Sequence, residues 1–296
     1  MKLVKSWQLY VLILPGLLYL CIFHYGPMIG LQIAFRNYTP SLGIFGSPWV
    51  GMKHFRYFLQ SPQFTVLIYN TVSISVLFLI FSFPMPIILA LMLNESYSVW
   101  FKKLIQNLTY IPHFVSVTVL VGMVISFTSP SIGIINKIVE LCGGKPIDFM
   151  GKAQWFRPLY ILSGIWQTTG WGSIIYLAAL SGIDTQLHEA AEIDGANRLQ
   201  RIWHINVPGI LPTAIILFIL TCGRVMNVGF EKVFLMQNAL NLSTSEVIST
   251  YIYKTGLLGA QFSYTSAIGL FNSLINCFLL LIVNAVSRHI SETSLF

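Results

Sequence analysis

Long stretches without a single charged side chain constrain this chain more than any other feature. Six windows lack Lys, Arg, Asp and Glu: Leu9–Phe35, Thr65–Leu93, Leu104–Phe127, Pro158–Leu180, Ile205–Gly223 and Phe262–Ser287. A membrane-spanning helix needs roughly 20 mostly apolar residues. Prolines inside the windows, such as Pro84 and Pro112, are expected to kink helices without breaking them, because neighbouring helices satisfy the freed carbonyls. The sequence therefore predicts an all-α membrane protein with six transmembrane helices, forming one domain over 1–296.

The composition supports this class. Charged residues make up 9% of the 296 residues, against about 25% in an ordinary soluble domain. The formal net charge of +7 is spread along the chain without a basic run of the kind that binds nucleic acid, so no nucleic-acid partner is expected. The four cysteines stand far apart, and no group of residues has the spacing of metal ligands. We expect no metal site and no catalytic residue.

The most acidic run lies in segment 181–208, between the fourth and fifth windows. It reads Glu189-Ala190-Ala191-Glu192-Ile193-Asp194-Gly195 and is followed, after nine residues, by Ile205-Asn206-Val207-Pro208. A charged loop between two apolar windows must lie outside the lipid. Asp184 or Thr185 is expected to cap a short helix, which Gly195 ends in a left-handed turn. A second short helix should follow over about 197–205, with Pro208 in the first turn of the next span. This helix–turn–helix is either a contact for a soluble partner or an ordinary amphipathic loop.

The spacing of this segment resembles the coupling-loop signature of permease subunits of bacterial binding-protein-dependent ABC importers. The matching positions are Glu189, Ala190, Ala191, Gly195, Ile205 and Pro208, and Val207 stands where the family has leucine. The flanking runs 176–180, 247–253 and 263–271 resemble the maltose-type, carbohydrate-importing branch, and within it the permeases for oligosaccharide and polysaccharide uptake.

The resemblance implies a type I ABC importer permease fold that works by alternating access. It also implies a second homologous permease subunit, two ATP-binding subunits that hold ATP and Mg²⁺, an extracytoplasmic solute-binding protein and a carbohydrate cargo, all in or at a membrane lipid bilayer. Neither Gly143-Gly144-Lys145 nor Gly151-Lys152 completes a phosphate-binding loop. We therefore expect no cofactor in this chain and the ATPase activity on a separate subunit. Lys and Arg do not decide the orientation; the resemblance places the coupling loop and both termini in the cytoplasm of a bacterial cell.

Sugar binding needs polar groups for the hydroxyls and aromatic faces for the apolar side of the ring. In maltose-type permeases, which this chain resembles, cargo contacts lie on the spans just before and just after the coupling loop. Counting from Glu189 transfers these positions to Gln167, Thr168, Trp171, Thr221 and Arg224, with Asn227 close by. Trp171 could equally pack between helices, and Arg224 could equally extend to the interface. Glu231 and Lys232 are expected in a solvated loop.

Two other functional classes need features that this sequence lacks. An ion-coupled carrier or channel, acting without an ATPase partner, would need ionisable groups in mid-span, and the centres of the six windows contain none. A membrane transferase would need a His/Asp/Glu cluster near one membrane face, and none is apparent. The sequence favours a permease that translocates oligosaccharide or polysaccharide fragments.

Overall fold

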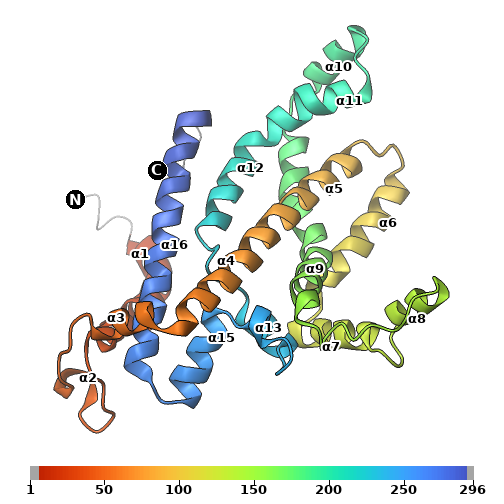
Figure 1. Cartoon of the computed structure of the whole chain (residues 1–296). Coiled ribbons are helices and arrows are strands. Elements are labelled where there is room, and N and C mark those ends of the chain that lie inside the picture. Colours follow the sequence, from red (N-terminus) through yellow and green to blue (C-terminus); the bar gives the residue numbers. More distant parts are fainter. Residues whose placement is uncertain (1–6, 292–296) are drawn as a thin grey trace. The chain divides into compact units, whose positions relative to one another are not determined.

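A computed structural model describes residues 7–291; Lys2, Lys5 and the last five residues lie outside the described range. Within that range the regular elements are helices, together with one isolated β-bridge between Arg36 and Trp49. The chain forms two compact units, Met1–Phe64 with Ile252–Asn272, and Thr65–Tyr251 with Ser273–Phe296. The elements of both are labelled in Figure 1.

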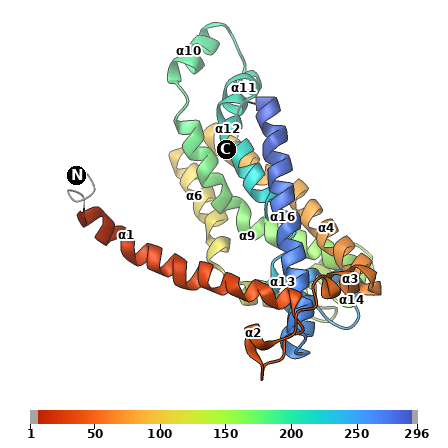
Figure 2. The same ribbon diagram turned by 90° about the vertical axis from the view of Figure 1, so that its left-hand side faces the viewer.

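The first unit begins with a long apolar helical run. α1 (Trp7–Leu20) continues through a π-helical turn, η2 (Cys21–Tyr25), into the 3₁₀ helix η3 (Gly26–Phe35) (Figure 2). Pro27 has no N–H, and its ring meets the carbonyl four residues earlier, so the helix widens in the turn before it. In the apolar run Leu9–Phe35, residues 9–29 leave their side chains exposed all round and Ala34 is buried near the end; exposure of apolar side chains on every face is typical of a membrane span.

Aromatic side chains hold the rest of the first unit together. The short helices α2 (Gly43–Gly46) and α3 (Lys53–Gln60), the π-helix η6 (Tyr253–Leu258) and the start of α16 (Phe262–Ser291) belong to it. Phe58 is buried and packs edge-to-face against Phe64 and Phe271. Arg36 Nη1 donates to the carbonyl oxygens of Phe45 and Ser47 at 3.0 and 2.8 Å. These two bonds close the loop that carries α2.

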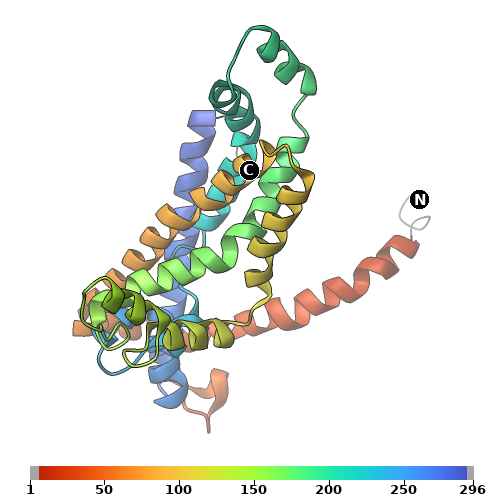
Figure 3. The ribbon, with the colours of Figure 1, turned by 90° about the vertical axis from the view of Figure 1, so that its right-hand side faces the viewer.

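The long helix α9 (Ala153–Ser181) lies at the centre of the second unit. It packs against α5 (Pro84–Asn94), α6 (Val99–Tyr110) and α12 (Val207–Cys222). Gly170 allows close approach to α6, since a Cβ there would collide with the Thr109 carbonyl, and the two helices run side by side in Figure 3. The hydroxyls of Thr168 and Thr169 donate to carbonyls one turn earlier at 2.9 and 2.7 Å, so these polar groups need no water.

Two apolar cores flank α9. One joins α5, α9 and α12 through Ala90, Tyr176, Leu180, Ile210 and Ala214. The other joins α9 to α4 (Pro62–Ser82), α7 (Val117–Thr128) and α13 (Phe230–Met236), through residues that include Ile74, Val121, Phe156 and Val233. The shorter elements of this unit are η4 (Ile111–Phe114), α8 (Ile134–Leu141), α10 (Thr185–Ile193), α11 (Arg198–Arg201), η5 (Ile202–Asn206), α14 (Leu242–Ser245) and α15 (Ile248–Ile252).

Four helical runs in residues 7–291 are long and apolar enough to cross a membrane: Leu9–Phe35, Pro62–Asn94, Arg198–Cys222 and Phe262–Arg288. The run Pro62–Asn94 contains Pro84 and is one such span, as predicted. The third window is different, because Val99–Phe114 and Val117–Thr128 meet at 103°. The expectation of a mere kink at Pro112 is wrong: Ser116 caps a new helix by accepting from Val119 N at 3.3 Å. The fourth window lies in α9, which has 29 residues but is more polar.

Candidate functional site

The segment 181–208 forms an elbow that extends beyond α9 and α12 (Figure 1). Asp184 Oδ1 accepts from Gln186 N at 2.9 Å and caps α10. The helix ends at Ile193, and Gly195 turns the chain away from it with a φ of +77°, the left-handed conformation that favours glycine. Ala196 N then donates to Ala191 O at 2.9 Å. The predicted cap and the predicted glycine turn are both confirmed, with Asp184 as the capping residue.

The second half of the elbow is fastened in three ways. Asn197 and Gln200 form a reciprocal capping box, with N–H···O distances of 2.9 and 2.7 Å. Arg201 Nη1 lies 3.5 Å from Glu192 Oε2 across the turn. The Arg198 guanidinium lies 4.5 Å from the ring centroid of Tyr97, in the loop between α5 and α6. Together these contacts stiffen the elbow and attach it to a second loop.

The outer surface of the elbow is apolar and exposed. More than half of each side chain is accessible at Leu187, Ile193, Leu199 and Trp203. Glu189 and Ala190 are also exposed, and Glu189 makes no ion pair with any residue that the structure describes. Ala191, Gly195 and Ile205 line a depression of about 310 Å³, and Pro208 follows in the first turn of α12. An apolar surface with a charged rim is typical of a protein contact.

A cavity of about 510 Å³ lies at the end of α12. The predicted residues Thr221, Arg224 and Asn227 all line it. Thr221 Oγ1 donates to Leu217 O at 2.7 Å, and Asn227 Oδ1 accepts from Asn276 Nδ2 at 3.0 Å. The Arg224 side chain is exposed to the cavity without an ion pair in the described part of the chain. No Asp or Glu lines this cavity, and Arg224 gives its lining a positive charge.

The three predicted residues on α9 lie outside this cavity. Gln167 Nε2 donates to Val115 O at 2.9 Å, and Thr168 bonds within its own helix. The Trp171 ring stacks on His113 with centroids 4.6 Å apart and planes 2° apart. Trp171 therefore contacts η4, while 46% of its surface remains exposed. The predicted residues that follow the elbow in the sequence share one cavity. Those that precede it, Gln167 and Trp171, lie instead beside the bend between η4 and α7.

Other elements contribute cavity residues that counting from Glu189 does not reach. Ser75 and Phe78 come from α4, and Tyr160 comes from the beginning of α9. Spacing along one helix identifies neighbours on that helix only. The sequence therefore did not indicate that Ser75 and Phe78 of α4 line the same cavity as Arg224. Tyr160 was noticeable as an aromatic residue near the start of the fourth window.

Lys232 was expected in a solvated loop, and that expectation is wrong. Its side chain is buried, 8% exposed, behind the cavity wall. Lys232 Nζ donates to Tyr160 O at 2.8 Å and lies 4.5 Å from the centroid of the Tyr160 ring. The carbonyl and the ring face replace part of the hydration that the ammonium loses.

Comparisons with known proteins agree with this geometry. The family model described as "Binding-protein-dependent transport system inner membrane component" matches residues 82–292. The polygalacturonan/rhamnogalacturonan transport system permease protein YteP of Bacillus subtilis (strain 168) is 43% identical over 100% of this chain and 92% of its own. Protein LplB of the same organism is 44% identical over 97% and 91%.

Two solved structures are also similar. One is a bacterial ABC transporter involved in the import of the acidic polysaccharide alginate, with a TM-score of 0.91, 42% identity and 98% of both chains covered. The other is a bacterial alginate ABC transporter in complex with an alginate pentasaccharide-bound periplasmic protein, with a TM-score of 0.92, 41% identity and coverage of 99% and 98%.

Proposed function

The chain belongs to the family of inner membrane components of binding-protein-dependent transport systems and is a permease subunit of an ABC importer. We propose that the cargo of this importer is an acidic oligosaccharide. The predicted fold class, an all-α type I importer permease, is confirmed. The family consists of transport components, not enzymes. Relatives named for polygalacturonan and for alginate support a cargo of uronate sugars.

The cavity at the end of α12 carries the cargo proposal. A uronate oligosaccharide presents carboxylates, hydroxyls and the apolar faces of its rings. Arg224 supplies a guanidinium that matches a carboxylate in two-point geometry, Thr221 and Asn227 supply polar groups, and Phe78 supplies an aromatic wall. The acid-free lining leaves Arg224 available to an anion. A volume of about 510 Å³ is within the range of small-ligand sites, roughly 300–1,000 Å³.

The elbow is the proposed contact with an ATP-hydrolysing subunit. Its exposed apolar residues and the unpaired Glu189 support that role, and Ala190, Ala191 and Gly195 keep the surface low enough for close contact. A stiff elbow continuous with α12 would pass the partner's movement to the membrane helices. In the full assembly two ATP-binding subunits holding ATP and Mg²⁺, a second permease and an extracytoplasmic binding protein would drive alternating access. The elbow and both termini would then face the cytoplasm.

Uptake into proteoliposomes tests the cargo assignment. The assembled complex, with its binding protein, should import trigalacturonate in an ATP-dependent manner. Arg224→Gln should lower that uptake about tenfold, because a charge-assisted hydrogen bond contributes roughly 1.5–3 kcal/mol, part of which solvent screens here. Arg288→Gln, which removes an exposed positive charge outside the cavity, is the matched control. Equal uptake by the Arg224 and Arg288 variants would contradict the assignment.

A further inference from the structure

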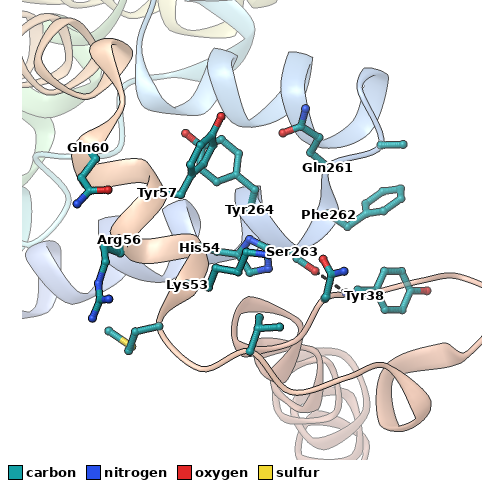
Figure 4. A pocket seen from close by; sticks show the side chains of 14 residues that line it. Tyr38, Lys53, His54, Arg56, Tyr57, Gln60, Gln261, Phe262, Ser263 and Tyr264 are labelled. Atoms are coloured by element: carbon teal, nitrogen blue, oxygen red, sulfur yellow. Dashed lines mark hydrogen bonds between the residues drawn. The ribbon is translucent and has the colours of Figure 1, made fainter.

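A cavity in the first unit has no role in the function described above. It has a volume of about 710 Å³ and lies between α3, the loop after η3 and the start of α16. Lys53, Arg56, Tyr57 and Gln60 form one wall on α3, and Gln261, Phe262, Ser263 and Tyr264 form the other (Figure 4). A space of this size accommodates one or two sugar residues.

The positive charge around this cavity is not compensated. Residues 36–64 and 252–272 contain four basic residues and no Asp or Glu. Arg36 is occupied by the carbonyls of Phe45 and Ser47. Lys53 and Arg56 are exposed and line the cavity, and neither has a carboxylate partner among residues 7–291. Two adjacent cations without counterions favour an anionic ligand.

The neighbouring histidine does not add a formal charge at neutral pH. Burial lowers the pKa of His54, the bond to Arg36 opposes this effect, and the positive charge of Lys53 lowers the pKa further. His54 Nε2 donates to Arg36 O at 3.1 Å, which leaves Nδ1 of the neutral ring as an acceptor. The ring is therefore a neutral hydrogen-bonding group beside the two cations.

An aromatic corner lies next to the cations. The rings of Tyr57 and Tyr264 meet edge-to-face with centroids 5.2 Å apart (Figure 4). Tyr264 is buried, whereas 64% of Tyr57 is exposed. The amides of Gln60 and Gln261 also line the cavity and offer donors and acceptors to hydroxyl groups. An exposed phenol ring beside amides suits a pyranose ring, whose C–H face is apolar and whose edge is polar.

The walls of the cavity are fixed before any ligand binds. Tyr38 N donates to Ser263 Oγ at 2.8 Å, and Gln261 N donates to Thr255 O at 3.1 Å. Ala260, at the rim, has a φ of +54°, a left-handed conformation that is unfavourable for a residue with a Cβ. Strained backbone of this kind gathers at binding sites, where the surrounding structure holds it in place.

We propose that this cavity is a second carbohydrate subsite, which binds a carboxylate-bearing sugar residue of the cargo through Lys53 and Arg56 with Tyr57 against the ring. The proposal rests on the function proposed above. Its lining comes from the segment after the first predicted span and from the segment that leads into the last one. With the termini in the cytoplasm, as proposed above, the predicted six-span topology puts both segments on the extracytoplasmic side, where cargo arrives. The subsite is therefore an entry site, occupied before the cargo crosses.

Photolabelling with a defined probe tests this subsite. A photoreactive trigalacturonate would be applied to the complete complex in nanodiscs without binding protein, and labelled peptides would be mapped by mass spectrometry. Label is expected on 53–60 or 260–264, displaced by trigalacturonate but not by its methyl ester. The double variant Lys53→Gln/Arg56→Gln should be labelled about tenfold less than the wild type, since each exposed charge contact changes affinity by only a few fold and the variant removes two. Tyr57→Ala should lose it as well.

The matched control is Lys137→Gln/Lys145→Gln, which removes two exposed charges from the loop between α7 and α9; its labelling should equal that of the wild type. Equal labelling of the Lys53/Arg56 variant, or displacement by the neutral ester, would overturn the subsite. A third outcome would also overturn it: no label on the wild type, together with weaker docking of the binding protein to the Lys53/Arg56 variant. That outcome would assign Lys53 and Arg56 to a protein contact. Trigalacturonate uptake, measured in parallel, separates the two proposals: uptake without label overturns the subsite alone, whereas no uptake overturns the cargo assignment.

Discussion

Lys232 illustrates how much a single residue depends on tertiary packing. A lysine beside a glutamate, at the start of a short helix between two spans, is typical of a solvated loop. The structure instead places its side chain against Tyr160. Burial lowers the pKa of Lys232 from 10.5 to about 7, because the charged ammonium loses hydration. The contacts with Tyr160 explain the buried position of Lys232 without an anionic partner.

The lowered pKa predicts a pH-dependent stability. Between about pH 7 and 10.5 the unfolded chain binds a proton at Lys232 that the folded chain does not bind. Folding stability from this group therefore rises with pH across that window, by roughly 1 kcal/mol per pH unit, and is constant below it. The melting temperature of the complex should rise between pH 7 and 9, and Lys232→Met should lose that rise while Lys137→Met keeps it. An unchanged rise in Lys232→Met would contradict this account.

The cavity shows which of the predicted residues the fold brings together. Thr221, Arg224 and Asn227 line the same cavity, because all three follow one another on α12 and the turn after it, so their relation is local. Gln167 and Trp171 were not brought to the same place, because their surroundings depend on the bend after η4, which no local pattern specifies. Which residues share a helix face follows from 3.6-residue periodicity. Which helices meet depends on the packing of distant segments.

At the scale of elements, the elbow is the part that the sequence predicts best. Its signals are local: Asp184 before α10, Gly195 after it, and Pro208 in the first turn of α12. The third window is the opposite case. Its length and apolar character fit a span, but the break between η4 and α7 depends on Ser116 acting as a cap, and Ser116 resembles any other serine in an apolar run.

Gly195 provides a test of the elbow as an element. A Cβ at this position would meet nothing within 4 Å, so Gly195→Ala would act only through its φ of +77°, at a cost of roughly 1–2 kcal/mol. We expect Gly195→Ala to reduce binding-protein-stimulated ATP hydrolysis several-fold, and Gly195→Asn, which tolerates this conformation, to reduce it less. Gly182→Ala, at an ordinary φ of −89°, is the control. Full stimulation in Gly195→Ala would show that the turn has no role in coupling.

At the scale of the whole molecule, charge divides between the two units. Within residues 7–291 all nine acidic residues lie in the second unit, and residues 7–64 with 252–272 have none. The second unit carries the elbow, which is the proposed contact with the ATP-hydrolysing subunit. The first carries the acid-free cavity proposed as an entry subsite. The prediction of a sugar-importer permease succeeded because the spacing of residues in the elbow is specific to this family. The basic residues of the first unit, in contrast, indicate a binding site only once the fold places Lys53 and Arg56 at one cavity.

The account depends most on the elbow being the contact with a separate ATP-hydrolysing subunit, and site-specific photocrosslinking in the assembled complex tests this directly. Ile193 on α10 and Leu141 at the end of α8 are each 87% exposed, and α10 and α8 lie at opposite ends of the second unit (Figure 1). A photocrosslinking residue at position 193 should capture the ATP-hydrolysing subunit, with a yield that changes when ATP is added, and the same residue at position 141 should not. Capture of that subunit from position 141, with none from position 193, would contradict the account.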